Sequence, residues 1–158
     1  MTSEEFARLV TKYTDTVFRV ALNLVKSPSA AEDVCQEVFL RFWKSKTVFP
    51  DEESIRYWLI RVTINEGRRS LRSKWNKYES LDNYTDTLYF LPAENRELFD
   101  SVMNLPKKYR IVIYLFYYEG YSTSEISGLL SSSPATVRMQ LHRGRELLKK
   151  NLLEAEDV

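Results

Sequence analysis

Two clusters of positively charged side chains have the types and spacing that could do chemistry, namely the binding of phosphates. Residues 55–78 contain one anion, Glu66, and seven cations. The seven are Arg56, Arg61, Arg68, Arg69, Arg72, Lys74 and Lys77. Residues 138–150 contain five cations against one anion, Glu146, although the net charge of the whole chain is only +1. Two basic clusters in a nearly neutral chain predict two separate contacts with nucleic acid.

The side chains that catalytic and metal sites require are scarce. There is one histidine, His142, and one cysteine, Cys35, so the usual soft ligands cannot form a metal cluster. The four glycines form no phosphate-cradling loop, and no nucleophile-elbow motif occurs. Acidic runs such as residues 51–53 are expected to be solvated. The sequence therefore predicts a protein that is not an enzyme and uses no metal and no cofactor.

The second basic cluster belongs to a helix-turn-helix pattern within residues 105–152. Ser122 and Glu125 have the spacing of a capping box, which starts a short helix. Ser133 is the expected N-cap of the next helix, with Pro134 at its first position. That next helix is basic on its outer side. Two short helices around a tight turn, the second one basic, are typical of a helix that enters the DNA major groove.

The rest of the chain is also helical in its periodicity. Apolar residues recur at helical spacing, and the expected helices are 4–25, 30–44, 54–74, 95–104 and 107–118. A capping box of Ser29 and Glu32 is expected to start the second of them. Residues 75–92 lack periodicity, and their length exceeds that of a usual loop. We therefore predict an all-α protein of two small helical domains, 1–74 and 95–158, joined by a flexible linker at 75–94.

The expected location follows from what the chain lacks. The first ten residues, MTSEEFARLV, carry acidic side chains and no long apolar run, so no signal peptide is predicted. No segment approaches the ~20 apolar residues that a membrane span needs. A single cysteine rules out an internal disulfide, and we expect Cys35 to be an inert core thiol in a reducing compartment. These features predict a soluble cytoplasmic protein without membrane insertion.

Several motifs together carry a family resemblance. The first half reads AEDVCQEVFLRFW, then SIRYWLIRVTIN and RRSLR, and the second half reads LPKKYRIVIYLFYYEGYSTSEISGLL followed by SSSPATVRMQLHRGRELLKK. In this order and at this separation they resemble the extracytoplasmic-function group of bacterial RNA polymerase sigma factors, in the sigma-70 family. The resemblance covers residues 13–152. It implies a protein that directs core polymerase to specific promoters and opens the minus-ten DNA for transcription initiation.

For the first domain, the resemblance implies contacts with core polymerase and with the single-stranded minus-ten element. The positions that match the polymerase contact are Asp33, Gln36, Glu37 and Arg41. Those that match the minus-ten contact are Phe49, Arg61, Asn65, Arg68, Arg69 and Arg72. An asparagine amide can both donate to and accept from a base edge. The family commonly has an aspartate where this chain has Arg69, so this chain has an additional cation there.

For the second domain, the resemblance implies recognition of the minus-thirty-five element as duplex. The matching positions are Thr136, Arg138, Met139, His142 and Arg143. An arginine can bond in bidentate fashion to guanine. Backbone amides near Ser133 are expected to hold a phosphate at the start of the helix. Met139 and Gln140 depart from the family pattern, so the preferred promoter sequence is the least transferable property.

The resemblance also implies an anti-sigma partner and a linker that threads through polymerase. Two other classes of function stay open from the residues alone. One is a stand-alone regulator that binds duplex DNA as a dimer through its C-terminal helix, which leaves the first basic cluster unexplained. The other is a protein-interaction module, which predicts no binding of DNA with or without polymerase.

Overall fold

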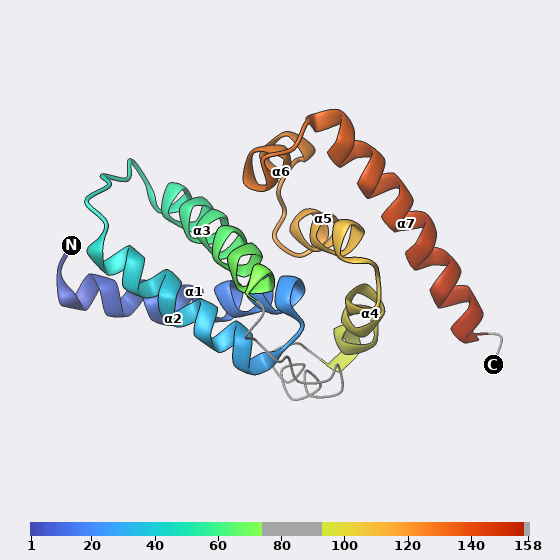
Figure 1. Ribbon diagram of the computed structural model, residues 1–158, viewed down its shortest axis with the longest axis horizontal. Helices are drawn as coiled ribbons and strands as arrows, with labels where there is room; N and C mark the ends of the chain where they lie inside the picture. The colour runs from blue at the N-terminus through green and yellow to red at the C-terminus, as the bar shows by residue number, and fades with distance from the viewer. Residues whose placement is uncertain (74–92, 157–158) are drawn as a thin grey trace. The chain divides into compact units, whose positions relative to one another are not determined.

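The structure, a computed structural model, describes residues 1–73 and 93–156. Every regular element in these ranges is a helix, and there are seven of them (Figure 1). The prediction of an all-α fold is therefore confirmed. The chain divides into two compact units, residues 1–85 (unit 1) and 86–158 (unit 2). The predicted linker, residues 75–94, lies almost wholly outside the described residues.

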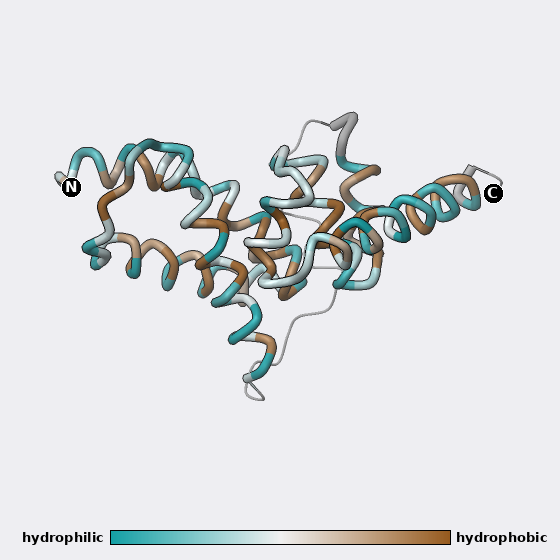
Figure 2. The backbone as a smooth tube through the Cα atoms, turned by 90° about the horizontal axis from the view of Figure 1, so that it is seen from above, coloured by the Kyte–Doolittle hydropathy of each residue, from teal (hydrophilic) through white to brown (hydrophobic). Residues whose placement is uncertain are grey.

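Unit 1 is a bundle of three helices, α1 (Ser3–Val25), α2 (Pro28–Lys44) and α3 (Glu52–Arg72), each packed against the other two. Apolar residues recur every three or four positions, so each helix buries one stripe, and brown and teal alternate along the helices in Figure 2. The most deeply buried apolar side chains are Leu9, Val17, Val20, Ala21, Leu22, Ala31, Val38, Phe42, Leu59, Ile60 and Ile64. Burying one large apolar side chain of this kind stabilises the fold by about 1.5–3 kcal/mol.

The start of α2 corrects the prediction made from the sequence. The N-cap is Ser27 and not Ser29, because the Ser27 hydroxyl accepts a hydrogen bond of 3.3 Å from the amide of Ala30. Pro28 then occupies the first helical position, where a missing N–H costs nothing. The helix at 54–74 likewise begins earlier, at Glu52, since the Asp51 carboxylate accepts from the amide of Ser54 at 2.8 Å.

Gly67 allows α3 to lie close to α1. A Cβ at this position would lie 2.7 Å from Leu24 Cδ1 and 3.2 Å from Leu24 Cβ. Such distances are shorter than ordinary van der Waals contact, so a larger side chain would push the two helices apart. The glycine therefore helps to set the position of the residues before and after it on α3.

Unit 2 contains four helices, α4 (Ala93–Met103), α5 (Lys107–Tyr117), α6 (Thr123–Leu130) and α7 (Pro134–Glu156). Helix α5 packs against the other three helices, and α7 also packs against α4 and α6. The most deeply buried apolar side chains are Phe99, Val102, Met103, Leu105, Val112, Ile113, Tyr114, Leu115, Ile126, Leu129 and Val137. Unit 2 thus has its own hydrophobic core.

The turn between α6 and α7 has the local structure that the sequence predicts. The capping box is present, with Glu125 N donating to Ser122 Oγ at 3.1 Å and Ser122 N donating to Glu125 Oε1 at 3.0 Å. Ser131 ends α6 in the left-handed conformation, at φ 54°. Ser133 Oγ then accepts from the amide of Thr136 at 3.1 Å. The predicted helix-turn-helix is confirmed.

Two kinds of feature are absent from the described residues. None of their helices has the length and apolar character of a membrane span. No group of three or more histidine, cysteine, aspartate or glutamate residues among them is arranged to hold a metal ion.

Candidate nucleic-acid interface

Four of the predicted minus-ten residues lie on one face of α3. Arg61, Asn65, Arg68 and Arg72 follow one another at intervals of four, three and four residues, which places them in one row along a helix. Arg61 and Arg68 are half-buried, whereas Asn65 and Arg72 are exposed. We call these four residues the α3 row. Its amide stands between guanidinium groups, so the row can contact both base edges and phosphates.

The α3 row concentrates positive charge. Burial lowers the pKa of the Arg68 guanidinium, and the neighbouring charges of Arg61 and Arg72 lower it further. Both effects disfavour the charged form, and an anion beside the arginines offsets them because an opposite charge favours that form. The row is therefore electrostatically suited to a phosphate chain.

Arg69 points to a different surface from the α3 row. It lines a hollow of about 220 Å³ between α2 and α3, together with Asp33, Glu37 and Glu66. The structure therefore brings this predicted DNA contact together with two residues of the predicted polymerase contact, Asp33 and Glu37.

Phe49 belongs to an aromatic cluster under the loop before α3. Its ring centroid lies 5.9 Å from that of Trp58, edge to face, and 6.1 Å from that of Phe42. The Phe42 and Trp58 rings are 5.7 Å apart. Phe49 also lines a hollow of about 480 Å³, beside Lys46 and other residues of the loop. An aromatic wall with a cation nearby is the combination that proteins use to stack an unpaired base.

Glu52, in the acidic run 51–53 that was expected to be solvated, instead joins the loop to α1. Its carboxylate accepts hydrogen bonds from Arg8 at 2.9 Å, from Tyr13 at 3.0 Å, and from Lys12. These hydrogen bonds lower the pKa of Glu52 to about 2. The bond from Lys12 has the largest effect, followed by those from Arg8 and Tyr13. These contacts hold the first turn of α3, and so the end of the loop that carries Phe49.

The predicted polymerase contact lies on the outer side of α2. Asp33, Gln36 and Arg41 are exposed, and Glu37 is half-buried. The guanidinium of Arg41 forms ion pairs with Glu37 and, on α3, with Glu66, each at 3.0 Å. The side chain of Glu66 is only 11% exposed. Sequence reasoning missed this pairing, although Glu66 was already conspicuous as the lone anion in the first basic cluster.

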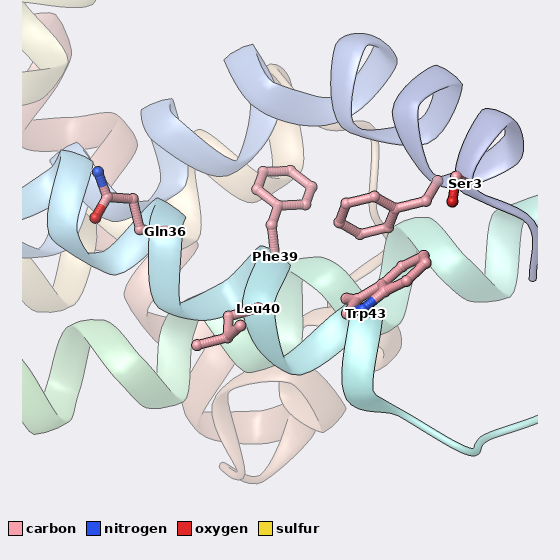
Figure 3. A pocket seen from close by; sticks show the side chains of 6 residues that line it. Ser3, Gln36, Phe39, Leu40 and Trp43 are labelled. Carbon is pink, nitrogen blue, oxygen red and sulfur yellow. The ribbon is translucent and has the colours of Figure 1, made fainter.

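An apolar hollow of about 480 Å³ continues from this face toward the start of α1 (Figure 3). Gln36, Phe39, Leu40 and Trp43 line it from α2. Trp43 lies in the last turn of α2, is 46% exposed, and its ring meets Phe6 edge to face at 4.9 Å. The α2 face thus combines charge with exposed apolar area.

On α7, four of the five predicted minus-thirty-five residues face solvent. Arg138, Met139, His142 and Arg143 are exposed, and they fall in two adjacent rows of the helix. Thr136 is half-buried, with its hydroxyl 2.8 Å from Ser133 Oγ. The structure therefore places Thr136 at the start of the helix, where it completes the cap, and the other four on an open face.

Two side chains of this part of α7, His142 and Arg145, have a neighbour that orients them. His142 Nε2 lies 2.9 Å from Glu146 Oε1, one turn along the helix. Arg145 donates to the hydroxyl of Tyr117, and its guanidinium lies over the rings of Phe116 and Tyr117. The contacts of Arg145 were not predicted, because the tyrosine and phenylalanine come from α5, about 28 residues earlier in the chain.

Comparison with known protein families matches both units. A model of sigma-70 region 2 matches residues 9–77, and one of sigma-70 region 4 matches residues 91–148. The chain is 31% identical to the ECF RNA polymerase sigma factor SigL of Mycobacterium tuberculosis, over 92% of this chain and 88% of SigL. It is 29% identical to SigW of Bacillus subtilis, over 94% of this chain and 89% of SigW.

One relative is much longer than this chain. The probable RNA polymerase sigma factor RfaY of Xanthomonas campestris is 29% identical over 98% of this chain, which spans 42% of RfaY. Solved structures of similar fold include RpoE of Bartonella quintana in complex with the anti-sigma factor NepR. It has a TM-score of 0.71 at 17% identity, over 94% of this chain and 97% of that one. CnrH, in complex with the cytosolic domain of CnrY, has a TM-score of 0.67 at 22% identity, over 98% of this chain and 90% of the CnrH chain.

Proposed function

Because this chain belongs to the extracytoplasmic-function group of RNA polymerase sigma factors, which direct polymerase to promoters and catalyse no reaction, we propose that its two domains divide promoter recognition between them. Residues 1–74 bind core polymerase and the minus-ten element. Residues 95–158 bind the minus-thirty-five element, and residues 75–94 connect the two.

The α3 row is the observation that carries the proposal for the first domain. A stand-alone duplex reader needs one basic helix, whereas this chain has a second basic surface, on another helix and in another unit. Asn65 reads a base edge of the opened strand, and Arg61, Arg68 and Arg72 bind its phosphates. Phe49 supplies an aromatic surface for an unpaired base, with Lys46 beside it in the same hollow.

The outer side of α2 is the proposed contact with core polymerase. Asp33 and Gln36 offer exposed polar groups there, and the Glu37–Arg41–Glu66 ion pairs hold α2 and α3 in one position. Arg69, next to these carboxylates, acts with this surface or with the DNA backbone that passes it.

For the second domain, the exposed face of α7 supports recognition of duplex DNA. Arg138 and Arg143 are placed to reach bases or phosphates of a major groove. Met139, which is 45% exposed, presents an apolar surface that suits a thymine methyl group. Thr136 belongs to the cap at the start of the helix, where backbone amides can bind a phosphate.

The proposed partners are core RNA polymerase, promoter DNA and an anti-sigma factor. Two sigma factors of similar fold were solved as complexes, one with the anti-sigma factor NepR and one with a domain of CnrY. Exposed apolar side chains occur in both units here, including Leu40 and Trp43 in unit 1 and Leu98 and Tyr117 in unit 2. Since a sigma factor acts where polymerase and the chromosome are, we place the protein in the cytoplasm.

Run-off transcription with core polymerase and this protein tests the proposal. The promoters come from a randomised library, selected by transcription with the unmodified protein. We expect initiation to require the protein, and Asn65→Ala to impair strand opening while core binding is retained. If the protein binds duplex tightly by itself and never supports initiation, it is a stand-alone regulator. If it binds no DNA with or without polymerase, it is an interaction module, and the sigma assignment of its activity is wrong.

A further inference from the structure

Gly144 brings α7 unusually close to α5. A Cβ on this glycine would lie 2.9 Å from Ile113 Cγ1 and 3.3 Å from Tyr109 Cβ. The close approach is possible only where the side chain is a hydrogen atom. Arg143, the residue before Gly144, is exposed. It therefore lies at the edge of the contact between α7 and α5, beside the first turn of α5.

Tyr109 is the residue of α5 that meets this edge. Its side chain is largely buried, at 9% exposure. The ammonium of Lys108 lies 5.0 Å from the centroid of the Tyr109 ring. Arg143 and, after it, Lys108 are the cations that hold the pKa of the Tyr109 phenol below its usual value. One neutral side chain thus organises two cations that come from different helices.

Lys108 and Arg143 make no ion pair with the carboxylates that the structure describes. Both side chains are exposed. Among the residues that the structure describes, Arg138 makes no cation–π contact with a ring of α5, whereas Lys108 does.

An anion with several oxygens fits such a pair. A guanidinium presents a planar fork of donors, an ammonium is a compact point charge, and both bind phosphate oxygens. Two like charges held on neighbouring helices gain more from a shared anion than either gains alone. The tyrosine hydroxyl limits the conformations of Arg143 before the anion binds, which reduces the entropy lost on binding.

We propose that Lys108 and Arg143, held together by Tyr109, bind one phosphate of the promoter duplex backbone beside the minus-thirty-five bases. Tyr109 is a positioning residue, and Lys108 is a DNA contact outside the helix-turn-helix. The inference rests on the proposed binding of duplex DNA by the second domain. It also assigns Arg143 to the backbone and leaves Arg138 as the arginine that reads a base.

Salt dependence of duplex binding is the direct test. Affinity of the holoenzyme for a promoter duplex is measured between 50 and 200 mM salt, for the unmodified chain and for Lys108→Ala, Arg143→Ala and the double variant. The double variant is expected to lower the slope of log affinity against log salt by about 0.9, the value for one phosphate. The two single effects are expected to be non-additive, since both side chains bind the same phosphate.

Tyr109→Phe separates positioning from packing, because it keeps the ring and removes the hydroxyl. We expect unchanged thermal unfolding, a several-fold loss of duplex affinity and little change in the loss caused by a base substitution in the promoter. Lys107→Ala is the matched control, since it removes one exposed cation from the same turn of α5. An equal loss in Lys107→Ala and Lys108→Ala would overturn the proposal, as would a Tyr109→Phe variant that binds like the unmodified chain.

Arg138→Ala distinguishes this inference from the function on which it rests. If Arg138→Ala weakens binding and the Lys108 and Tyr109 variants do not, only the phosphate site is wrong. If none of these variants changes duplex binding, the proposed role of the second domain is wrong as well.

Discussion

The α3 row and the outer face of α7 are both cationic, but they are built differently. In the α3 row, two of the arginines are half-buried and three lie close enough for their charges to affect one another. On α7, Arg138 and Arg143 are exposed, Arg143 acts on Tyr109 of α5, and His142 pairs with Glu146 of α7. The first is a continuous surface, and the second is a set of separately held side chains.

The difference corresponds to the two forms of DNA that the family recognises. A single strand has no fixed groove, so the protein must supply a fixed surface of charge and aromatic rings. A duplex has a fixed groove with a distinct pattern of donors and acceptors, so the protein needs side chains that reach outward at defined positions. The two units therefore place similar residue types in different surroundings.

Removing the α3 row is expected to have the largest effect. The triple variant Arg61→Ala, Arg68→Ala, Arg72→Ala loses three charge-assisted contacts, each worth roughly 1.5–3 kcal/mol, so open-complex formation should fall on the order of a hundredfold or more. The extent of open-complex formation is measured by the reactivity of unpaired thymines with permanganate.

Arg69→Ala is the control for this triple variant. It removes an arginine of α3 that faces the acidic hollow, so its effect on opening should be much smaller. A loss from Arg69→Ala that equals the loss from the triple variant would contradict the distinction between the row and its neighbour.

Arg138→Ala is expected to have the second-largest effect, which is on the recognition of duplex DNA. Loss of a bidentate contact with guanine costs about 1–3 kcal/mol, so affinity for the minus-thirty-five element should fall roughly 5- to 150-fold. Preference at one base pair should disappear at the same time. Binding to a set of duplexes substituted at each position of the element measures both quantities. An equal loss on every duplex would show that Arg138 contacts only the backbone.

Gly144→Ala tests whether the close packing of α7 against α5 supports the outer face of α7. The added methyl group meets Ile113 and Tyr109, so we expect the free energy of unfolding of unit 2 to fall by about 1–2 kcal/mol, strain outweighing the gain in helix propensity. Thermal unfolding of the chain measures the loss. Gly67→Ala is the counterpart in unit 1, where the nearest atom is the mobile end of Leu24, so its effect should be smaller. The reverse order would contradict this account.

Glu52→Gln is expected to have the smallest effect and a defined pH dependence. The pKa of Glu52 is lowered from 4.5 to about 2, so the ionised carboxylate stabilises unit 1 at pH values above 4.5. This stabilisation is lost as the pH falls toward 2. Denaturant unfolding at several pH values should show that the difference between the two proteins shrinks over that window. A constant difference down to pH 2 would mean that charge is not the cause.

Much of the fold could be predicted from the sequence because its signals are local. The capping box of Ser122 and Glu125, and Ser133 before Pro134, lie within four residues, so they could be read directly. The error at the start of α2 has the same origin. Ser27 precedes Pro28 just as Ser133 precedes Pro134, but Ser29 and Glu32 also have the spacing of a capping box, so two local signals competed and the structure has Ser27 as the cap.

The candidate site was predictable only in part. The spacing of Arg61, Asn65, Arg68 and Arg72 places them on one face of any helix, so the row was accessible from the sequence. The pairing of Arg41 with Glu66, and of Arg143 with Tyr109, joins residues on different helices. Such contacts depend on how the helices pack, which periodicity does not specify.

The division of promoter recognition between the two units is tested most directly by combining protein and promoter substitutions. Transcription is measured for the unmodified protein, Asn65→Ala and Arg138→Ala on promoters with single substitutions in either element. We predict that Asn65→Ala loses its sensitivity to one minus-ten base and keeps its sensitivity to the minus-thirty-five bases, and that Arg138→Ala does the opposite. If both variants lose sensitivity to the same element, the two units do not divide the task.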